Sequence, residues 1–159
     1  MNSLNWDAIG ALAEVVGAVG VIFSLLYLAL QIRTQNVQAK LTARHEIASG
    51  LRQASGVYAM DDLTEIFVRA NENYDAISEA ESVRLIVVTT NLFRAWEEAF
   101  LTQKDGHLGV DMWVVISRDY TQTMGASSMR HIWSIRKGNY DPDFQKYVDG
   151  LDSQQYISR

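Results

Sequence analysis

The sequence predicts an all-α protein in which an N-terminal transmembrane helix continues as an amphipathic stalk into a cytoplasmic helical bundle. Three observations carry this prediction. The chain of 159 residues contains one proline, so little interrupts its helices. Apolar residues recur at helical spacing over most of its length. One segment near the N-terminus is apolar on all sides, which is typical of a membrane span.

Composition excludes several classes of protein and site. The chain has no cysteine, which rules out disulfide bonds, thiolate zinc sites and cysteine nucleophiles. Its 14 Lys and Arg against 19 Asp and Glu give a formal charge of −5, the wrong sign for a general nucleic-acid binder. A length of 159 residues suits one ordinary domain rather than an enzyme with separate cofactor and substrate modules.

The transmembrane helix is predicted within residues 1–32. Residues 15–32 are 18 positions without a charge, and the largely apolar stretch extends back to residue 8 with Glu14 as its one charged member. About 20 helical residues cross a hydrocarbon core of about 30 Å. The alternatives are a buried core helix, which so small a domain rarely surrounds, and a cleaved signal peptide, which needs basic residues before its apolar core. Residues 1–8 contain no Lys or Arg, so we expect a retained anchor.

The charges that flank this segment predict its orientation. Residues 33–60 carry a net charge of +3, whereas residues 1–32 carry −2 and residues 61–159 carry −6. The positive-inside rule therefore puts the C-terminal 127 residues in the cytoplasm and the short N-terminus outside. An interfacial aromatic ring and the basic collar should then meet lipid headgroups. The residues expected there are Trp6, Arg33, Lys40 and Arg44.

Small residues form a stripe along the apolar segment, at alternating spacings of three and four. The stripe predicts an oligomer seam, because small side chains let transmembrane helices approach closely and a 3.5-residue period favours left-handed packing. Chance is the alternative, since Gly and Ala are common in transmembrane helices. The seam residues are Gly10, Ala13, Gly17, Gly20 and Ser24, and the polar Tyr27 and Gln31 continue the stripe. The expected partner is a further copy of the chain.

Glu14 is the residue of this segment that most needs a partner. A carboxylate in hydrocarbon is costly unless it is protonated, paired or hydrated. If the hydrocarbon region begins near Ala8, Glu14 lies about 9 Å inside it, and a ring of its copies around an oligomer axis is one solution. If that region begins near Val15, Glu14 is an interfacial acid on the outer side. Both interpretations stay open at the level of sequence.

The stalk is expected over residues 33–56. No Gly or Pro interrupts the chain between Val21 and Ala48, so the helix of the span should continue into it. Gly50 or the pair Ser55–Gly56 should mark a kink or the end of this helix. The apolar face of the stalk is expected to consist of Val37, Leu41, Ala48 and Leu51.

Four or five further helices are expected in residues 57–159, and each has a signal at its start. Asp, Ser and Asn cap helix N-termini because their side chains accept a hydrogen bond from a free backbone N–H. The longest of these helices should begin with a capping box at residues 78–81 and end near residue 104. The expected caps in chain order are Asp61 or Asp62, Ser78, Asp111, and Asp141 followed by Pro142, and Ser127 or Ser128 should start a further helix.

Motifs for catalysis and metal binding are mostly absent. The sequence has no phosphate-binding glycine loop, no nucleophile elbow and no HExxH motif, and none of its three His has the Glu-x-x-His spacing of a di-iron bundle. A membrane-tethered enzyme using Glu97, Glu98 and His131 is one hypothesis. Arg94 beside Glu97 and Glu98 is explained more simply as an ion pair on a helix face. We therefore expect a non-enzymatic protein without catalytic residues, bound metal or cofactor.

Four stretches of the chain carry a resemblance. They are WDAIGALAEVVG at residues 6–17, SLLYLALQIR at residues 24–33, FRAWEE at residues 93–98 with KDG at residues 104–106, and YDPDFQKYVD at residues 140–149. Through them the chain resembles a widespread group of short, uncharacterised bacterial membrane proteins that pair one membrane span with a small helical cytoplasmic domain. The resemblance implies a bacterial inner-membrane location. It implies no activity, and it suggests that Glu14, Gln31 and Arg33 belong to a shared pattern.

Two functions follow as hypotheses. The leading one is a non-enzymatic bitopic inner-membrane protein that homo-oligomerises through its transmembrane helix. Its cytoplasmic helical domain would serve as a scaffold or interaction module for lipid or for other membrane or cytoplasmic proteins, and not for nucleic acid. The alternative is an oligomeric ion-conducting pore in which a ring of Glu14 lines the outer mouth and Tyr27 and Gln31 line the inner part.

Overall fold

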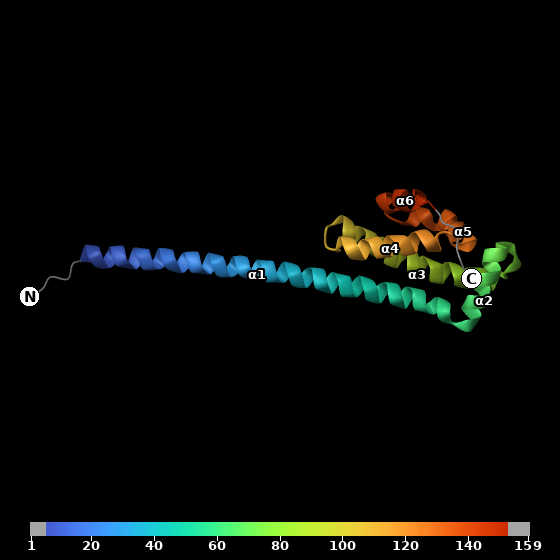
Figure 1. Ribbon diagram of the computed structural model, residues 1–159, viewed down its shortest axis with the longest axis horizontal. Coiled ribbons are helices and arrows are strands. Elements are labelled where there is room, and N and C mark those ends of the chain that lie inside the picture. Colours follow the sequence, from blue (N-terminus) through green and yellow to red (C-terminus); the bar gives the residue numbers. More distant parts are fainter. Residues whose placement is uncertain (1–5, 153–159) are drawn as a thin grey trace, which may run out of the picture. The chain divides into compact units, whose positions relative to one another are not determined.

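The computed structural model describes residues 6–152 of the chain, and in these residues it contains only helices (Figure 1). The all-α prediction is therefore confirmed. The chain divides into two units, Met1–Ala39 and Lys40–Arg159. The elements are α1 (Trp6–Gly56), η1 (Val57–Ala59), α2 (Asp61–Glu72), η2 (Tyr74–Ala76), α3 (Glu79–Lys104), α4 (Val110–Thr123), α5 (Ser127–Arg136), η3 (Lys137–Asn139) and α6 (Pro142–Asp149), where η denotes a short 3₁₀-helix.

The first unit consists of the N-terminal part of α1. This helix is long and apolar enough to cross a membrane, and no residue of its most apolar 18-residue window is buried. Large side chains such as Phe23 and Leu25 are 67% and 60% exposed. The core helix of a water-soluble domain would bury such side chains, because leaving each of them in water costs about 1.5–3 kcal/mol.

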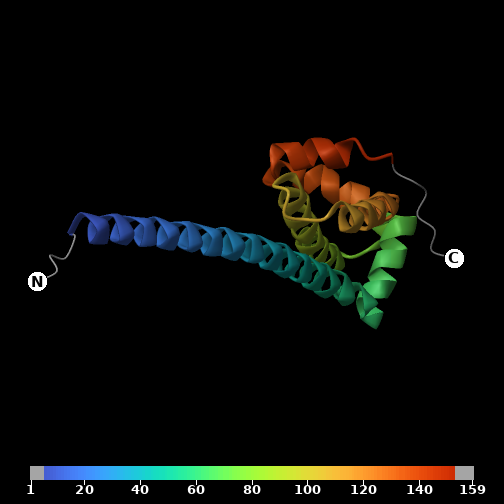
Figure 2. The same ribbon diagram turned by 60° about the vertical axis from the view of Figure 1, so that its left-hand side comes forward.

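Helix α3 is the centre of the second unit, residues 40–159, which we call the helical domain. Helices α2, α4, α5 and α6 all contact it (Figures 1 and 2). Its inward face follows the helical spacing predicted from sequence, because residues three and four apart share one side of a helix. The buried residues of α3 are Leu85, Thr89, Leu92, Phe93, Trp96 and Ala99.

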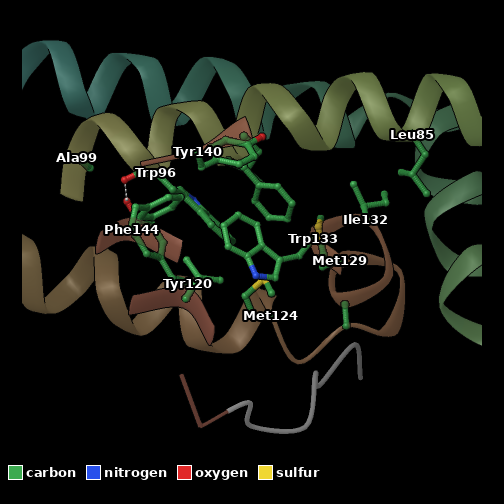
Figure 3. Packing of buried hydrophobic residues seen from close by; sticks show 14 of the residues in the cluster. Leu85, Trp96, Ala99, Tyr120, Met124, Met129, Ile132, Trp133, Tyr140 and Phe144 are labelled. Carbon is green, nitrogen blue, oxygen red and sulfur yellow. Dashed lines mark hydrogen bonds between the residues drawn. The ribbon is translucent and has the colours of Figure 1, made fainter. Parts of the chain in front are cut away.

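Aromatic rings fill much of the core between these helices (Figure 3). The Trp96 ring stacks on Tyr120 of α4 with 4.3 Å between ring centroids. Phe93, one turn earlier on α3, meets the Trp133 ring of α5 edge-on at 5.3 Å. Trp133 in turn contacts Phe144 of α6 at 5.8 Å. Aromatic pairs in these geometries stabilise a fold by about 0.5–1.5 kcal/mol beyond the effect of burying their surface. These pairs therefore stabilise the packing of α3, α4, α5 and α6.

The C-terminal part of α1 joins this core through one stripe of side chains. Ile47 is 4% exposed, and Leu51 and Ala54 pack against the core. These residues lie four and three apart, so they share one side of the helix. Of the expected apolar face, Leu51 packs against the core, whereas Val37 and Leu41 are 54% and 61% exposed. Gly50 lies within α1 and Gly56 ends it, as the sequence allowed.

Two of the predicted helix starts are confirmed. Ser78 and Glu81 form the capping box of α3, in which the Glu81 N–H donates to Ser78 Oγ and the Ser78 N–H donates to Glu81 Oε2 at 2.8 Å. Asp141 caps α6 by accepting from the backbone N–H groups of Asp143 and Phe144, and Pro142 is its first residue.

Two predicted caps were wrong. Met60 and Gly109 precede α2 and α4, and neither makes a side-chain capping hydrogen bond. The acidic residues that were expected to cap these helices, Asp61, Asp62 and Asp111, lie within their first turns instead. A third predicted start is confirmed, because α5 begins at Ser127. Negative charge in a first turn still favours the helix, because the N-terminal end of the helix dipole is positive.

The capping box predicts a loss of stability in acid. The Arg69 guanidinium and the hydrogen bonds from Ser78 lower the pKa of Glu81 from 4.5 to about 2. Because the native pKa is the lower one, this contribution is fully present above pH 4.5 and is lost as the pH falls toward about 2. Urea titrations of the full chain in detergent, across this pH range, should show a shallower acid loss for Glu81→Gln than for the wild type.

The matched control for this prediction is Glu79→Gln. Glu79 lies in the same turn, and in the described residues its carboxylate forms no ion pair or hydrogen bond. Its replacement should leave the acid dependence of stability close to that of the wild type. Equal acid slopes for Glu81→Gln and the wild type would contradict the assignment.

Candidate functional site

The predicted seam is an open stripe on α1. Its residues are exposed, and an added Cβ at Gly10, Gly17 or Gly20 would meet nothing within 4 Å. A stripe of small side chains allows a second helix to approach at short backbone distance, which is how transmembrane helices gain dispersion contacts in lipid. The stripe thus offers the geometry that helix association needs.

The polar members of the stripe bond within their own helix. Ser24 Oγ donates to the Gly20 carbonyl at 2.9 Å, and Gln31 Nε2 donates to the Tyr27 hydroxyl at 2.9 Å. Such bonds lower the cost of placing these groups in hydrocarbon. The Tyr27 O–H and the Gln31 side-chain carbonyl each keep capacity for a further bond. A neighbouring helix can supply the partner.

Glu14 lies beside the stripe, one residue after Ala13. Its side chain is exposed, and among the described residues it forms no ion pair or hydrogen bond. The nearest basic residue along the chain after it is Arg33, so no cation of its own helix lies within a turn. Within the described residues this carboxylate therefore has no partner.

The residues expected at lipid headgroups follow the apolar segment along α1. Arg33, Lys40 and Arg44 are exposed, and in the described part of the chain none of them forms an ion pair. Free basic side chains are suited to anionic headgroups, each worth about 1 kcal/mol near a charged membrane surface. Trp6 begins α1, but its side chain lies outside the described residues.

Glu97, Glu98 and His131, the residues of the enzyme hypothesis, have different neighbours. Glu97 Oε2 pairs with Arg94 at 2.7 Å, and Glu97 Oε1 accepts from the Asp141 backbone N–H at 2.6 Å. His131 stacks on the Tyr74 ring with 4.0 Å between centroids. Glu98 is exposed. The described residues contain no group of three or more His, Cys, Asp and Glu that could hold a metal ion.

Arg94 and Glu97 hold the loop that precedes α6 against α3. Arg94 Nη2 donates to the Asn139 carbonyl at 3.0 Å, and its guanidinium lies 4.4 Å from the centroid of the Tyr140 ring. Glu97 accepts a hydrogen bond from the backbone N–H of Asp141, two residues after Asn139. Arg94 and Glu97 therefore bind the residues on both sides of Tyr140. This arrangement matches the ion pair expected from sequence and adds a tertiary role to it.

This role predicts a stability effect. Glu97→Ala leaves the Asp141 N–H without its acceptor, and losing a hydrogen bond to a charged group at a site only 12% exposed should cost about 1–3 kcal/mol of unfolding free energy. Urea unfolding of the full chain in detergent measures this. Glu98→Ala, at the exposed neighbouring position, should change stability by less than about 0.5 kcal/mol. Equal effects of the two variants would contradict the role.

A groove between α1 and α4 was not predicted from sequence. It has a volume of about 450 Å³ and lies within the helical domain. Its apolar lining includes Leu51, Val115 and Ile116, and Arg52, Arg118 and Asp119 line it as well. Burial raises the pKa of Asp119. We call this surface the basic groove. Arg52 and Arg118 lie far apart in sequence, so no local pattern signals it.

Comparison of the chain with family models, with curated proteins and with solved structures gives no match. The resemblance stated from the sequence therefore stays a prediction. The candidate site of this protein consists of the open stripe on α1 and the surfaces of the helical domain.

Proposed function

We propose that the chain is a membrane-anchored, non-enzymatic protein that assembles with copies of itself and presents its helical domain as an interaction module. In this proposal the apolar part of α1 spans the membrane. The N-terminus lies outside and residues 33–159 lie in the cytoplasm, in accord with the +3 charge of residues 33–60.

One observation carries the proposal: the most apolar 18-residue window of α1 is entirely exposed. An apolar helix of this length in water would have to find a covering surface, because exposed patches of that size drive association. Lipid tails provide such a surface along the whole helix. The basic residues that follow the window would meet headgroups, and this agrees with the same placement.

The open stripe supports self-association as part of the proposal. Gly10, Gly17 and Gly20 leave space for a neighbouring backbone, and the hydrogen-bonding capacity of Tyr27 and Gln31 lies on the same stripe. Within lipid there is no hydrophobic force between helices, so close packing and interhelical hydrogen bonds decide whether they associate. Both are available here to identical helices in parallel.

Two measurements test this function. Alkaline carbonate should leave the chain in the membrane fraction, because a spanning helix is not released by charge changes. The mass of the protein in mild detergent should exceed that of one chain, and Gly17→Leu with Gly20→Leu should reduce it. Release by carbonate would contradict the anchor. A monomer whose mass is unaffected by the glycine replacements would contradict the seam.

An ion-conducting pore is a second candidate, and the unpartnered carboxylate of Glu14 favours it. Copies of Glu14 around an oligomer axis would give a cation-attracting ring in contact with water. Planar-bilayer recording of the wild type and of Glu14→Gln tests this candidate. Cation conductance that falls in the variant supports a pore. No conductance, or conductance that is indifferent to the replacement, removes it.

A further inference from the structure

We propose that the acidic face of α2 in one copy docks into the basic groove of a neighbouring copy. The acidic face consists of Asp61, Glu65, Val68 and Glu72. The inference rests on the proposed function, because it requires copies of the chain to lie side by side. It adds a second contact, in the helical domain, to the seam on α1.

The basic groove has apolar lining residues and exposed cations. Val115, which lines the groove beside the buried Ile116, is 67% exposed, so the groove presents apolar surface to solvent. Arg52 and Arg118 are exposed, and in the described residues neither forms an ion pair. Asp119 is the acid that lines the groove beside them. The groove therefore suits an occupant with an apolar centre flanked by negative charge.

The acidic face of α2 has that character. Its residues follow at spacings of four, three and four, so they share one side of the helix. Val68 is 49% exposed in the middle of the face. Asp61, Glu65 and Glu72 are exposed and form no ion pair within the described chain. The neighbouring Asp62 and Arg69 pair with Arg84 and Glu81 of α3, and Arg69 also interacts electrostatically with Glu65.

The basic groove and the acidic face are distinct surfaces of one chain, since the groove lies between α1 and α4 and the acidic face lies on α2. A contact between different surfaces of identical chains is made twice in a two-fold dimer and once per neighbour in a ring. Either assembly satisfies the charges.

Because the chain has no native cysteine, every disulfide cross-link must come from introduced thiols. Cross-linking therefore tests the contact directly. Two full-length chains with different tags, one carrying Val68→Cys and the other Val115→Cys, are expressed together and oxidised in their membranes. We expect the mixed Val68–Val115 adduct to exceed the two same-site adducts by about five- to thirtyfold. Equal amounts of mixed and same-site adducts would overturn the contact.

Charge reversal then tests why the surfaces meet. Arg52→Glu with Arg118→Glu in the groove should reduce the mixed adduct by a similar factor, and Glu65→Lys with Glu72→Lys in the partner should restore it. Asp119→Asn should increase the adduct, since it removes the like charge. Arg136→Glu, at an exposed position of α5, is the control and should change nothing. A loss that the complementary reversal does not restore would contradict charge pairing.

Failure of this contact is distinguishable from failure of the proposed function. An oligomer in mild detergent that gives no mixed adduct overturns the contact and leaves the seam on α1 standing. A monomer in mild detergent, with no adduct of any kind, overturns both. Adduct that survives about 1 M salt unchanged contradicts an ionic contact, because the screening length there is about 3 Å.

Discussion

Replacing Trp96 with Ala is expected to lower the unfolding free energy of the helical domain by about 3–5 kcal/mol. Trp96 is 1% exposed, and its ring contacts those of Phe93 and Tyr120 at centroid distances of 5.4 and 4.3 Å. Figure 3 shows Trp96 and Tyr120 in the core. Small domains are stable by about 5–15 kcal/mol, so this variant approaches the limit at which the domain unfolds. Loss of near-ultraviolet circular dichroism and a reduced urea midpoint would report the change in the detergent-solubilised chain.

Two further variants separate the cause of this loss from a general effect of mutation. Trp96→Phe keeps an aromatic ring in the core and should cost less than Trp96→Ala. The Trp96 indole N–H is buried and has no acceptor among the described residues, so its removal sacrifices no hydrogen bond. Val87→Ala, on the same helix but 53% exposed, should cost under about 0.5 kcal/mol. A Trp96→Ala variant as stable as Val87→Ala would refute the packing described for α3.

Arginines in the middle of the apolar segment should prevent membrane insertion. Ile22 and Leu26 are both 57% exposed and lie four apart on α1. Arg near the centre of a spanning helix costs about 2.5–3.5 kcal/mol per residue, so Ile22→Arg with Leu26→Arg should cost about 5–7 kcal/mol of insertion free energy. Arg is a good helix former, so the loss would not reflect a broken helix. We expect the variant to leave the carbonate-resistant membrane fraction.

The matched control carries the same change beyond the segment. Val37 and Leu41 are 54% and 61% exposed and are also four apart on α1. Val37→Arg with Leu41→Arg adds the same charge where headgroups are expected, so this chain should stay in the membrane. If both double variants insert as the wild type does, the apolar part of α1 does not span a bilayer.

Local patterns explain why most of the fold could be predicted from the sequence. The start of α3 depends on Ser78 and Glu81, which bond to each other across three residues. The start of α6 depends on Asp141 and its neighbours in the same way. The inward face of α3 follows from apolar spacing alone. Interactions between residues so close along the chain can be predicted from a short window of sequence.

Polar side chains at the starts of helices also make tertiary contacts that no local pattern shows. Ser127 Oγ donates to the Asn71 carbonyl at 2.6 Å and Ser128 Oγ donates to Asn71 Oδ1 at 2.7 Å, across more than 50 residues. These bonds join α5 to α2. Asp62 likewise pairs with Arg84 of α3. A side chain with a distant partner gives no local sign of it.

The candidate site likewise has one part that could be predicted from local sequence and one part that could not. The stripe from Gly10 to Ser24 lies on one helix, so it could be recognised from the spacing of residues in the sequence, without knowledge of the fold. The basic groove depends on Arg52 and Arg118 meeting across α1 and α4, which only the packing of the domain reveals. Glu97 and Asp141 are a further case, since their hydrogen bond joins residues 44 positions apart.

Thiol labelling in intact cells tests the spanning orientation of α1 most directly. In a chain without native cysteine, Asp7→Cys and Gly138→Cys place one thiol before the apolar segment and one at an exposed position of the helical domain. We expect a membrane-impermeant maleimide to label Asp7→Cys in intact cells and Gly138→Cys only after permeabilisation. Labelling of both positions in intact cells, or of neither until permeabilisation, would contradict a spanning helix with its C-terminal domain inside.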